Sequence, residues 1–258
     1  MIDTHAHICD KTLDAGEIIA SMRADGLKKI ICVGYDFKSS TDAVLLSSTN
    51  ADIYSTVGIH PNYAHTATDK QLEALISMVK NSKKNQKIVA VGEIGLDYFH
   101  KFCDKDTQRQ WFLRQLEAYS DLKLPFVFHL RDAYGDFSTL IAQEKAKIRS
   151  AAVMHCYSGS AECARQYLDL GFYISFGGAV TFKNWKGCDV VRAVPLDRIL
   201  VETDSPWLSP EPFRGKTNAP KNVKFVIEKL AAVLGLSFEQ VEKATTANAE
   251  RLFFGKQC

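Results

Sequence analysis

Short apolar runs recur along the chain, and each is followed by a stretch with the spacing of an amphipathic helix. The runs are rich in Val, Ile and Phe and are bordered by Gly or Pro, which favours buried strands. This pattern predicts eight strands, at residues 1–8, 27–35, 53–60, 87–94, 124–130, 150–156, 171–177 and 198–204.

The clearest predicted helix runs from Thr107 to Lys123, where apolar side chains repeat at helical spacing in Phe112, Leu116, Tyr119 and Leu122. Eight strands that alternate with helices imply right-handed βαβ units and a parallel sheet. Eight such units predict an α/β fold of the TIM-type (β/α)8 barrel, regular or distorted, as a single domain over residues 1–258. A doubly wound open sheet is the alternative, but no G-x-G-x-x-G follows the first strand.

Composition describes an ordinary globular chain, with 46% hydrophobic and 24% charged residues. A net charge of +2 is too mild to indicate a nucleic-acid binder by charge alone, so any anion site must come from a local cluster. No apolar run reaches transmembrane length, and His5 comes too early for a signal peptide to precede it. Nothing in the sequence indicates an obligate protein partner or a membrane contact.

The cysteines are odd in number and scattered, without any C-x-x-C pair. This usage fits neither a disulfide framework nor a zinc ribbon, and it favours a reducing compartment. The expected location is therefore cytoplasmic. The residues concerned are Cys9, Cys32, Cys103, Cys156, Cys163, Cys188 and Cys258.

Residue types that bind metals fall where the predicted strands end, which is the edge at which barrel enzymes keep their sites. In the first strand, Asp3, His5 and His7 alternate, so their side chains leave one face. Any one of these residues is more often structural, as a hydrogen-bonded histidine or a turn cap. Their joint placement predicts a metal site. The residues at these ends are His5, His7, His60, Glu93, His129, His155 and Asp204.

Histidines mixed with carboxylates suit transition metals better than a pure oxygen cage does. Four of these five histidines, with the glutamate and the aspartate, already exceed the needs of one tetrahedral ion and fit two ions bridged by a carboxylate. We expect two divalent ions per chain; the donor types favour zinc, manganese, cobalt or iron, and magnesium is kept as a further candidate. Such a pair lowers the pKa of a bound water and stabilises charge on a substrate, which indicates a hydrolase.

These residues stand in longer strings that resemble the TatD family of metal-dependent deoxyribonucleases, a branch of the amidohydrolase superfamily. The resemblance follows the family's order from residue 3 to residue 253, so it covers nearly the whole chain. The strings are DTHAH, GIHP, GEIGLDY, FHLRDA, HCYSGS, ISFGGAVTF, ETDSPWL, FRGKTNAP and TTANAERLF.

The resemblance implies a role for each matching position. His5, His7 and Asp204 would hold one metal. His129 and His155 would hold the second. Glu93 would bridge the two ions as a catalytic carboxylate. Asp204 would also act as the general base for water. The resemblance reads His60, in the G-x-H-P string, as a substrate or phosphate contact rather than a ligand.

Positive groups beside the metals would hold a phosphodiester. Arg131 shares the parity of His129 and would steady a phosphate, or else form an ion pair with Asp97 or Asp132. Arg214 and Lys216 lie in the family's R-G-K-x-N-x-P loop. In that loop Ala219 stands where many relatives carry glutamate, so no salt bridge is expected from this position.

Three functions remain open from the sequence. The first is a nuclease that cleaves DNA, single-stranded DNA included, from the 3′ end, as the resemblance implies. The second is an amidohydrolase that cleaves an ester or amide, including an aminoacyl-tRNA-type ester, because the same activated water serves both chemistries. The third is a catalytically idle metal-binding scaffold, which ranks last because every expected ligand is present.

Overall fold

The computed structural model describes residues 1–82 and 87–255 of the chain. Contacts divide these residues into a first unit, formed by residues 1–32 and 155–255, and a second unit, formed by the described residues from 33 to 154. The predicted domain end at residue 258, and with it Cys258, lies outside the described residues. A single domain over the whole chain therefore stays a prediction.

Each predicted run contains a strand, and β4 and β5 extend beyond the end of their runs. In the first unit, β1 pairs with β2 and β7 pairs with β8, and both pairs are parallel. In the second unit, β3, β4, β5 and β6 pair in sequence order, again all parallel. The strands are β1 (Ile2–Ala6), β2 (Lys29–Val33), β3 (Ile53–Val57), β4 (Ile88–Asp97), β5 (Phe126–Arg131), β6 (Ala152–Met154), β7 (Tyr173–Phe176) and β8 (Ile199–Val201).

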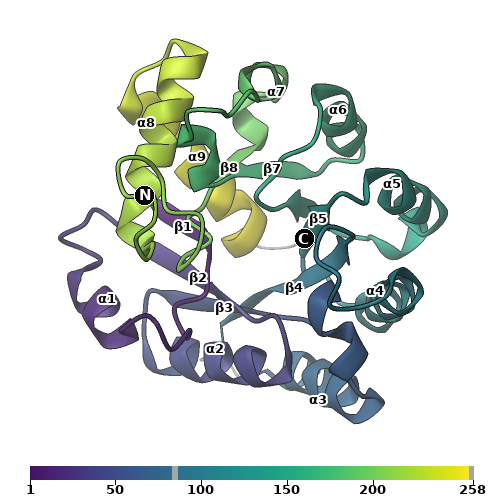
Figure 1. Ribbon diagram of the computed structural model, residues 1–258. Helices are drawn as coiled ribbons and strands as arrows, with labels where there is room; N and C mark the ends of the chain where they lie inside the picture. The colour runs from purple at the N-terminus through teal and green to yellow at the C-terminus, as the bar shows by residue number, and fades with distance from the viewer. Residues whose placement is uncertain (83–86, 256–258) are drawn as a thin grey trace. The chain divides into compact units, whose positions relative to one another are not determined.

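A helix follows every strand, as the βαβ pattern predicts (Figure 1). Several helices begin at a capping side chain that accepts a backbone N–H of the first turn, for example Asp36, Thr68 and Ser237. The helices are α1 (Ala15–Ser21), α2 (Phe37–Thr49), α3 (Asp69–Lys80), α4 (Lys105–Tyr119), α5 (Tyr134–Gln143), α6 (Ala161–Asp169), α7 (Cys188–Ala193), α8 (Val223–Leu234) and α9 (Phe238–Ala249).

Within residues 1–82 and 87–255, none of the helices combines the length and the apolar character that a bilayer span requires.

Helix α4 starts two residues earlier than predicted and ends at Tyr119. The Asp104 carboxylate accepts the N–H of Thr107 at 2.9 Å and so fixes the start. The predicted apolar stripe is buried at Phe112, and its ring packs edge-on against Phe128. Burial of such large aromatic side chains stabilises the core of the second unit.

Strands β4, β6 and β8 end at other residues than predicted, which changes where the candidate site residues lie. β6 ends at Met154 and β8 ends at Val201, earlier than predicted, and the predicted last residues of these runs lie beyond them, with Cys156 and Asp204 in left-handed conformations (φ of 43° and 55°). The fourth run continues to Asp97, so Glu93 lies inside β4 rather than at its end. Gly95 is required there, since a Cβ would lie 1.9 Å from the carbonyl oxygen of His129.

Candidate metal centre

The end of β1 is tied to the turn after β8 by backbone hydrogen bonds within the first unit. The N–H of Asp204 donates to the carbonyl of His5 at 2.9 Å, and the N–H of His7 donates to the carbonyl of Ser205 at 2.7 Å. The buried Asp3 accepts the N–H of Thr203 at 3.0 Å and its hydroxyl at 2.6 Å. These bonds bring His5, His7 and Asp204 together from opposite ends of the sequence.

Burial gives Asp3 an unusual charge state. Loss of solvent raises the pKa of Asp3 to about 8, although the hydrogen bonds from Thr203 and from the His5 N–H favour the ionised form. Asp3 therefore supports the strand end and is not itself one of the converging donors.

Three donor atoms converge in the first unit. The Nε2 atoms of His5 and His7 are 3.2 Å apart, and they lie 3.7 Å and 3.4 Å from Oδ1 of Asp204. Donor atoms bound to one tetrahedral ion at 2.0–2.1 Å are about 3.3 Å apart. The spacing of these three atoms fits a zinc-sized divalent ion.

The left-handed backbone of Asp204 turns its carboxylate towards these histidines. This conformation is tolerated by aspartate better than by most other side chains. Burial acts against ionisation of Asp204, but the hydrogen bond from His7 and the neighbouring His5 and His155 lower its pKa overall. Asp204 is therefore a carboxylate, as a metal ligand or a proton acceptor must be.

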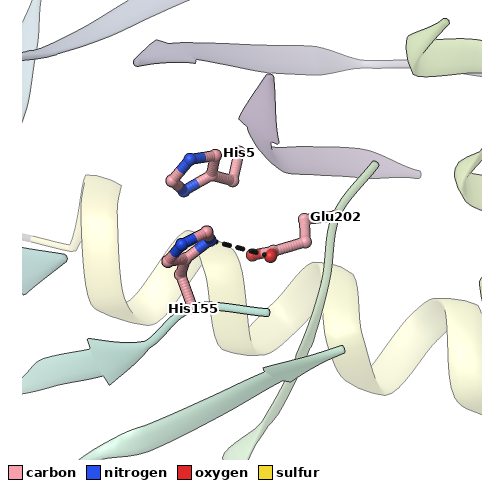
Figure 2. Close-up of side chains that lie close together, drawn as sticks. All are labelled: His5, His155 and Glu202. Carbon is pink, nitrogen blue, oxygen red and sulfur yellow. Dashed lines mark hydrogen bonds and ion pairs between the residues drawn. The ribbon is translucent and has the colours of Figure 1, made fainter. Parts of the chain in front are cut away.

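His155 lies directly after β6 and stacks on His5, with ring centroids 4.0 Å apart (Figure 2). Its Nδ1 is 3.1 Å from Oε1 of the buried Glu202. Glu202 also accepts the N–H of Cys156 at 2.7 Å and the hydroxyl of Ser175 at 2.5 Å. Since Nδ1–H donates to this carboxylate, Nε2 of His155 keeps its lone pair for a metal.

A second cluster of histidines and carboxylates lies in the second unit. Nδ1 of His129 is 2.8 Å from Oε1 of Glu93, and Nε2 is 3.1 Å from Oδ2 of Asp97. Asp97 also bonds Nδ1 of His100 at 2.8 Å and accepts from Nδ2 of Asn62 at 3.2 Å. Burial alone would raise the pKa of Asp97, but the bonds to His129 and His100 bring it well below the ordinary value.

His60 lies beside this cluster, with its Nε2 3.5 Å from Oε1 of Glu93. The N–H of Asn62 donates to Nδ1 of His60 at 3.0 Å. A neutral imidazole carries a single proton, so Nε2 of His60 bears it and is a donor. Because Nε2 of His60 then carries a proton and has no lone pair for a metal, His60 is better suited to contact a substrate than to coordinate an ion.

Two buried glutamines of α4 hold the chain beside these residues. Gln108 pairs with both backbone groups of Asp97, each at 2.8 Å. Gln115 pairs with the N–H and the carbonyl of Ile59, at 2.8 and 2.9 Å. Sequence reasoning missed both. The available signal was their seven-residue spacing, which places two polar side chains on the buried face of a helix.

The predicted substrate cations are exposed in their units. The guanidinium of Arg131 lies 4.1 Å from the ring centre of Phe99, whereas Asp97 bonds the histidines named above. Arg214 lies 3.8 Å from the ring centre of Phe182. Stacking of this kind orients a guanidinium and leaves its edge accessible to an anion.

The loop that carries Arg214 and Lys216 is fixed by Asn218. Nδ2 of this buried side chain donates to the carbonyls of Thr203 at 2.9 Å and Trp207 at 2.8 Å. The asparagine of the R-G-K-x-N-x-P string thus secures the turn that contains Asp204. Ala219 is half-buried beside it, and its N–H donates to Oδ1 of Asn218 at 2.9 Å.

Comparison with known proteins identifies the family. The family model described as TatD related DNase matches residues 2–254. The chain is 40% identical to the uncharacterized metal-dependent hydrolase YabD of Bacillus subtilis, over 98% of each protein. It is 33% identical to the uncharacterized metal-dependent hydrolase YcfH of Escherichia coli K12, over 98% of this chain and 95% of that protein. The chain belongs to the TatD family of metal-dependent hydrolases.

The fold comparison agrees with this assignment. The crystal structure of YjjV, a TatD homologue of Escherichia coli K12, matches with a TM-score of 0.90 at 27% identity and covers 98% of this chain and 97% of that one. The prediction of an α/β fold of the TIM-type (β/α)8 barrel is confirmed, as is the resemblance to the TatD family.

Proposed function

We propose that this TatD family protein is a deoxyribonuclease that cleaves phosphodiester bonds with an activated water. The observation that carries the proposal is the convergence of His5, His7 and Asp204, whose donor atoms lie 3.2–3.7 Å apart. The matching family model is described as a DNase. Arg214 and Lys216, exposed on the loop that Asn218 fixes, add positive charge suited to a phosphate backbone.

In this proposal His5, His7 and Asp204 hold one divalent ion, and the family resemblance assigns His129, His155 and Glu93 to a second. Divalent ions supply Lewis-acid activation of water and neutralise charge on the phosphate. Zinc, manganese, magnesium, cobalt and iron are the candidates.

The side chains have separate tasks. Glu202 fixes the ring of His155, and Asp97 fixes the ring of His129. Asp204, kept ionised by its histidine neighbours, accepts a proton from the attacking water. Nε2–H of His60 donates to a substrate oxygen, while Arg131, Arg214 and Lys216 contact backbone phosphates. The scattered cysteines support a reducing, cytoplasmic setting for this work.

The test is hydrolysis of a single-stranded DNA oligonucleotide labelled at its 5′ end, by protein reconstituted with each candidate metal. We expect a ladder of products shortened from the 3′ end and up to two bound ions per chain by elemental analysis. Cleavage of ester or amide substrates without any DNA cleavage would instead identify an amidohydrolase-type enzyme. A chain that binds metal and hydrolyses neither substrate class would be the idle scaffold.

A further inference from the structure

The segment between β4 and α4 exposes two aromatic rings within four residues. Phe99 is 53% exposed and Phe102 is 67% exposed, and they are two of the five large apolar side chains exposed among the described residues. We call residues 98–104 the aromatic loop. Exposed aromatic area at this density on a short loop marks a binding surface more often than a scattered single residue does.

Three rings of the aromatic loop contact one another in sequence order. The ring of His100 is nearly parallel to Phe102, at 11° and a centroid distance of 5.8 Å, and meets the ring of Phe99 edge-on at 4.9 Å. The guanidinium of Arg131 lies over Phe99. With 67% of its side chain exposed, Phe102 offers a free ring face at the end of this series.

Hydrogen bonds to buried groups hold the aromatic loop in place. Oδ1 of Asp97 accepts the N–H groups of Phe99 at 3.0 Å and His100 at 2.9 Å. Nε2 of Gln108 donates to the carbonyls of Asp97 at 2.8 Å and Cys103 at 3.0 Å, which closes both ends of the loop. The rings are therefore presented on a pre-organised backbone, which reduces the entropy lost on binding.

The same carboxylate connects the aromatic loop to the candidate metal ligand of this unit. Asp97 bonds the loop through Oδ1 and bonds Nε2 of His129 through Oδ2 at 3.1 Å. The surroundings carry both signs of charge. Lys101 and Arg131 are exposed and Lys105 lies 4.4 Å from the ring centre of Tyr98. The exposed Asp104 and Asp106 are bonded to the N–H of Thr107 and to Arg109, respectively. An aromatic face with flanking cations suits a ligand that combines a flat ring with negative charge.

We propose that the aromatic loop is a base-stacking subsite for single-stranded nucleic acid, in which Phe99 and Phe102 bind a nucleobase of the strand being cleaved. This inference rests on the proposed nuclease function and adds the part of the substrate that is recognised. Stacking on aromatic side chains is tolerant of sequence, because every base has a ring face. The subsite therefore selects unpaired bases without selecting their identity.

The test replaces both rings in the double variant Phe99→Leu/Phe102→Leu, which keeps apolar volume and removes the aromatic faces. Its affinity for a labelled single-stranded oligonucleotide is measured by fluorescence anisotropy in EDTA, so that no turnover interferes. The reference probe is the same strand with abasic residues. Leu45→Ala is the matched control, because Leu45 is 65% exposed on α2 of the same unit and carries no ring.

We expect the double variant to bind the base-containing strand about 5- to 150-fold more weakly, since stacking contributes about 1–3 kcal/mol per base. Affinity for the abasic strand should stay within twofold of wild type, and Leu45→Ala should match wild type on both probes. Equal affinities of variant and wild type, or equal losses on both strands, would overturn the subsite.

Three further outcomes can be distinguished. If the wild type cleaves DNA and the double variant binds DNA normally, the subsite is refuted and the nuclease function stands. Wild-type protein that neither binds nor cleaves DNA removes both proposals. Self-association of the wild type that the double variant abolishes, measured by sedimentation velocity, would make the loop an interface between copies and overturn the subsite.

Discussion

The two donor clusters differ in how their histidines are engaged. In the first unit, the nitrogen and oxygen atoms of His5, His7 and Asp204 lie 3.2–3.7 Å apart, which is the spacing of ligands around an ion. In the second unit, His129 lies between Glu93 and Asp97 at hydrogen-bond distances of 2.8 and 3.1 Å. Both clusters contain hydrogen bonds and donor atoms that could hold an ion, but the closest contacts differ: His129 lies 2.8 Å from a buried carboxylate oxygen, whereas the three donors of the first cluster are 3.2–3.7 Å apart.

This difference predicts which of the two clusters binds a metal ion more tightly. An ion that binds His129 must replace one of two hydrogen bonds to carboxylates, at 2.8 and 3.1 Å, whereas an ion in the first cluster replaces the longer contact of 3.4 Å between His7 and Asp204. We therefore expect stepwise loading, with the tighter ion held by the first cluster. Isothermal titration calorimetry of the metal-free protein with a divalent ion should resolve two binding steps of different affinity.

The largest effect is expected for Asp204→Asn. The substitution removes an anionic ligand and the proton acceptor while keeping side-chain volume, and loss of a general base alone costs about 10²–10⁴-fold in rate. Turnover of single-stranded DNA should fall at least a hundredfold, with the thermal unfolding transition by circular dichroism retained. Asp169→Asn, an exposed carboxylate at the end of α6, is the matched control. Near-wild-type turnover in the metal-loaded Asp204 variant would refute both roles.

Asp97→Asn should have the next largest effect and should act on the second cluster. The amide still offers an oxygen to the N–H groups of Phe99 and His100, but it no longer provides a charged acceptor for His129. Loss of such an outer carboxylate lowers metal affinity about 10–100-fold. Competition with a chromogenic chelator measures this change.

The selectivity of that loss sharpens the comparison between the clusters. Only the weaker of the two ions should be affected by Asp97→Asn, and Asp121→Asn, an exposed carboxylate of the same unit, should leave both unchanged. Equal weakening of both ions would contradict an effect of Asp97 that acts through His129 on the second ion. Unaltered affinity would remove Asp97 from the support of His129.

Sequence patterns predict the first cluster better than the second, for a physical reason. The alternation of His5 and His7 along a strand places both side chains on one face, and strand geometry alone establishes this. Glu202 and Asp97 act through side-chain hydrogen bonds to histidines far away in the sequence, and no local periodicity encodes such bonds. The eight strands and the barrel class follow from the repeated apolar runs, because burial on both faces leaves that pattern.

The rest depends on tertiary detail. Asp204 lies three residues beyond the end of β8 in a left-handed backbone conformation, so the period of a strand cannot place its side chain. The sequence left Arg131 open between a phosphate contact and an ion pair with Asp97 or Asp132. Its position over Phe99 follows from the parallel pairing of β4 with β5, which continues past Asp97 in the bond from the Tyr98 N–H to the Arg131 carbonyl at 2.9 Å.

The smallest expected effect concerns the exposed cations of the first unit. If Arg214 and Lys216 contact phosphates, the double variant Arg214→Gln/Lys216→Gln should bind single-stranded DNA more weakly without displacing metal. Each lost phosphate contact reduces the slope of log affinity against log salt by about 0.7, because fewer counterions are released. Two lost contacts therefore predict a slope shallower by about 1.4.

The measurement is oligonucleotide affinity at several salt concentrations for wild type and double variant, with metal content determined in parallel. Lys224→Gln/Lys229→Gln on α8 removes two charges of the same unit away from the R-G-K-x-N-x-P string and is the matched control. Because it changes net charge equally, it separates a local phosphate contact from a general loss of positive charge. Identical slopes for both double variants would show that Arg214 and Lys216 attract DNA only through net charge. A shallower slope for the Arg214/Lys216 variant alone would show that phosphates contact this loop. The contacts would then lie in the same unit as the first cluster, whose donor spacing fits an ion.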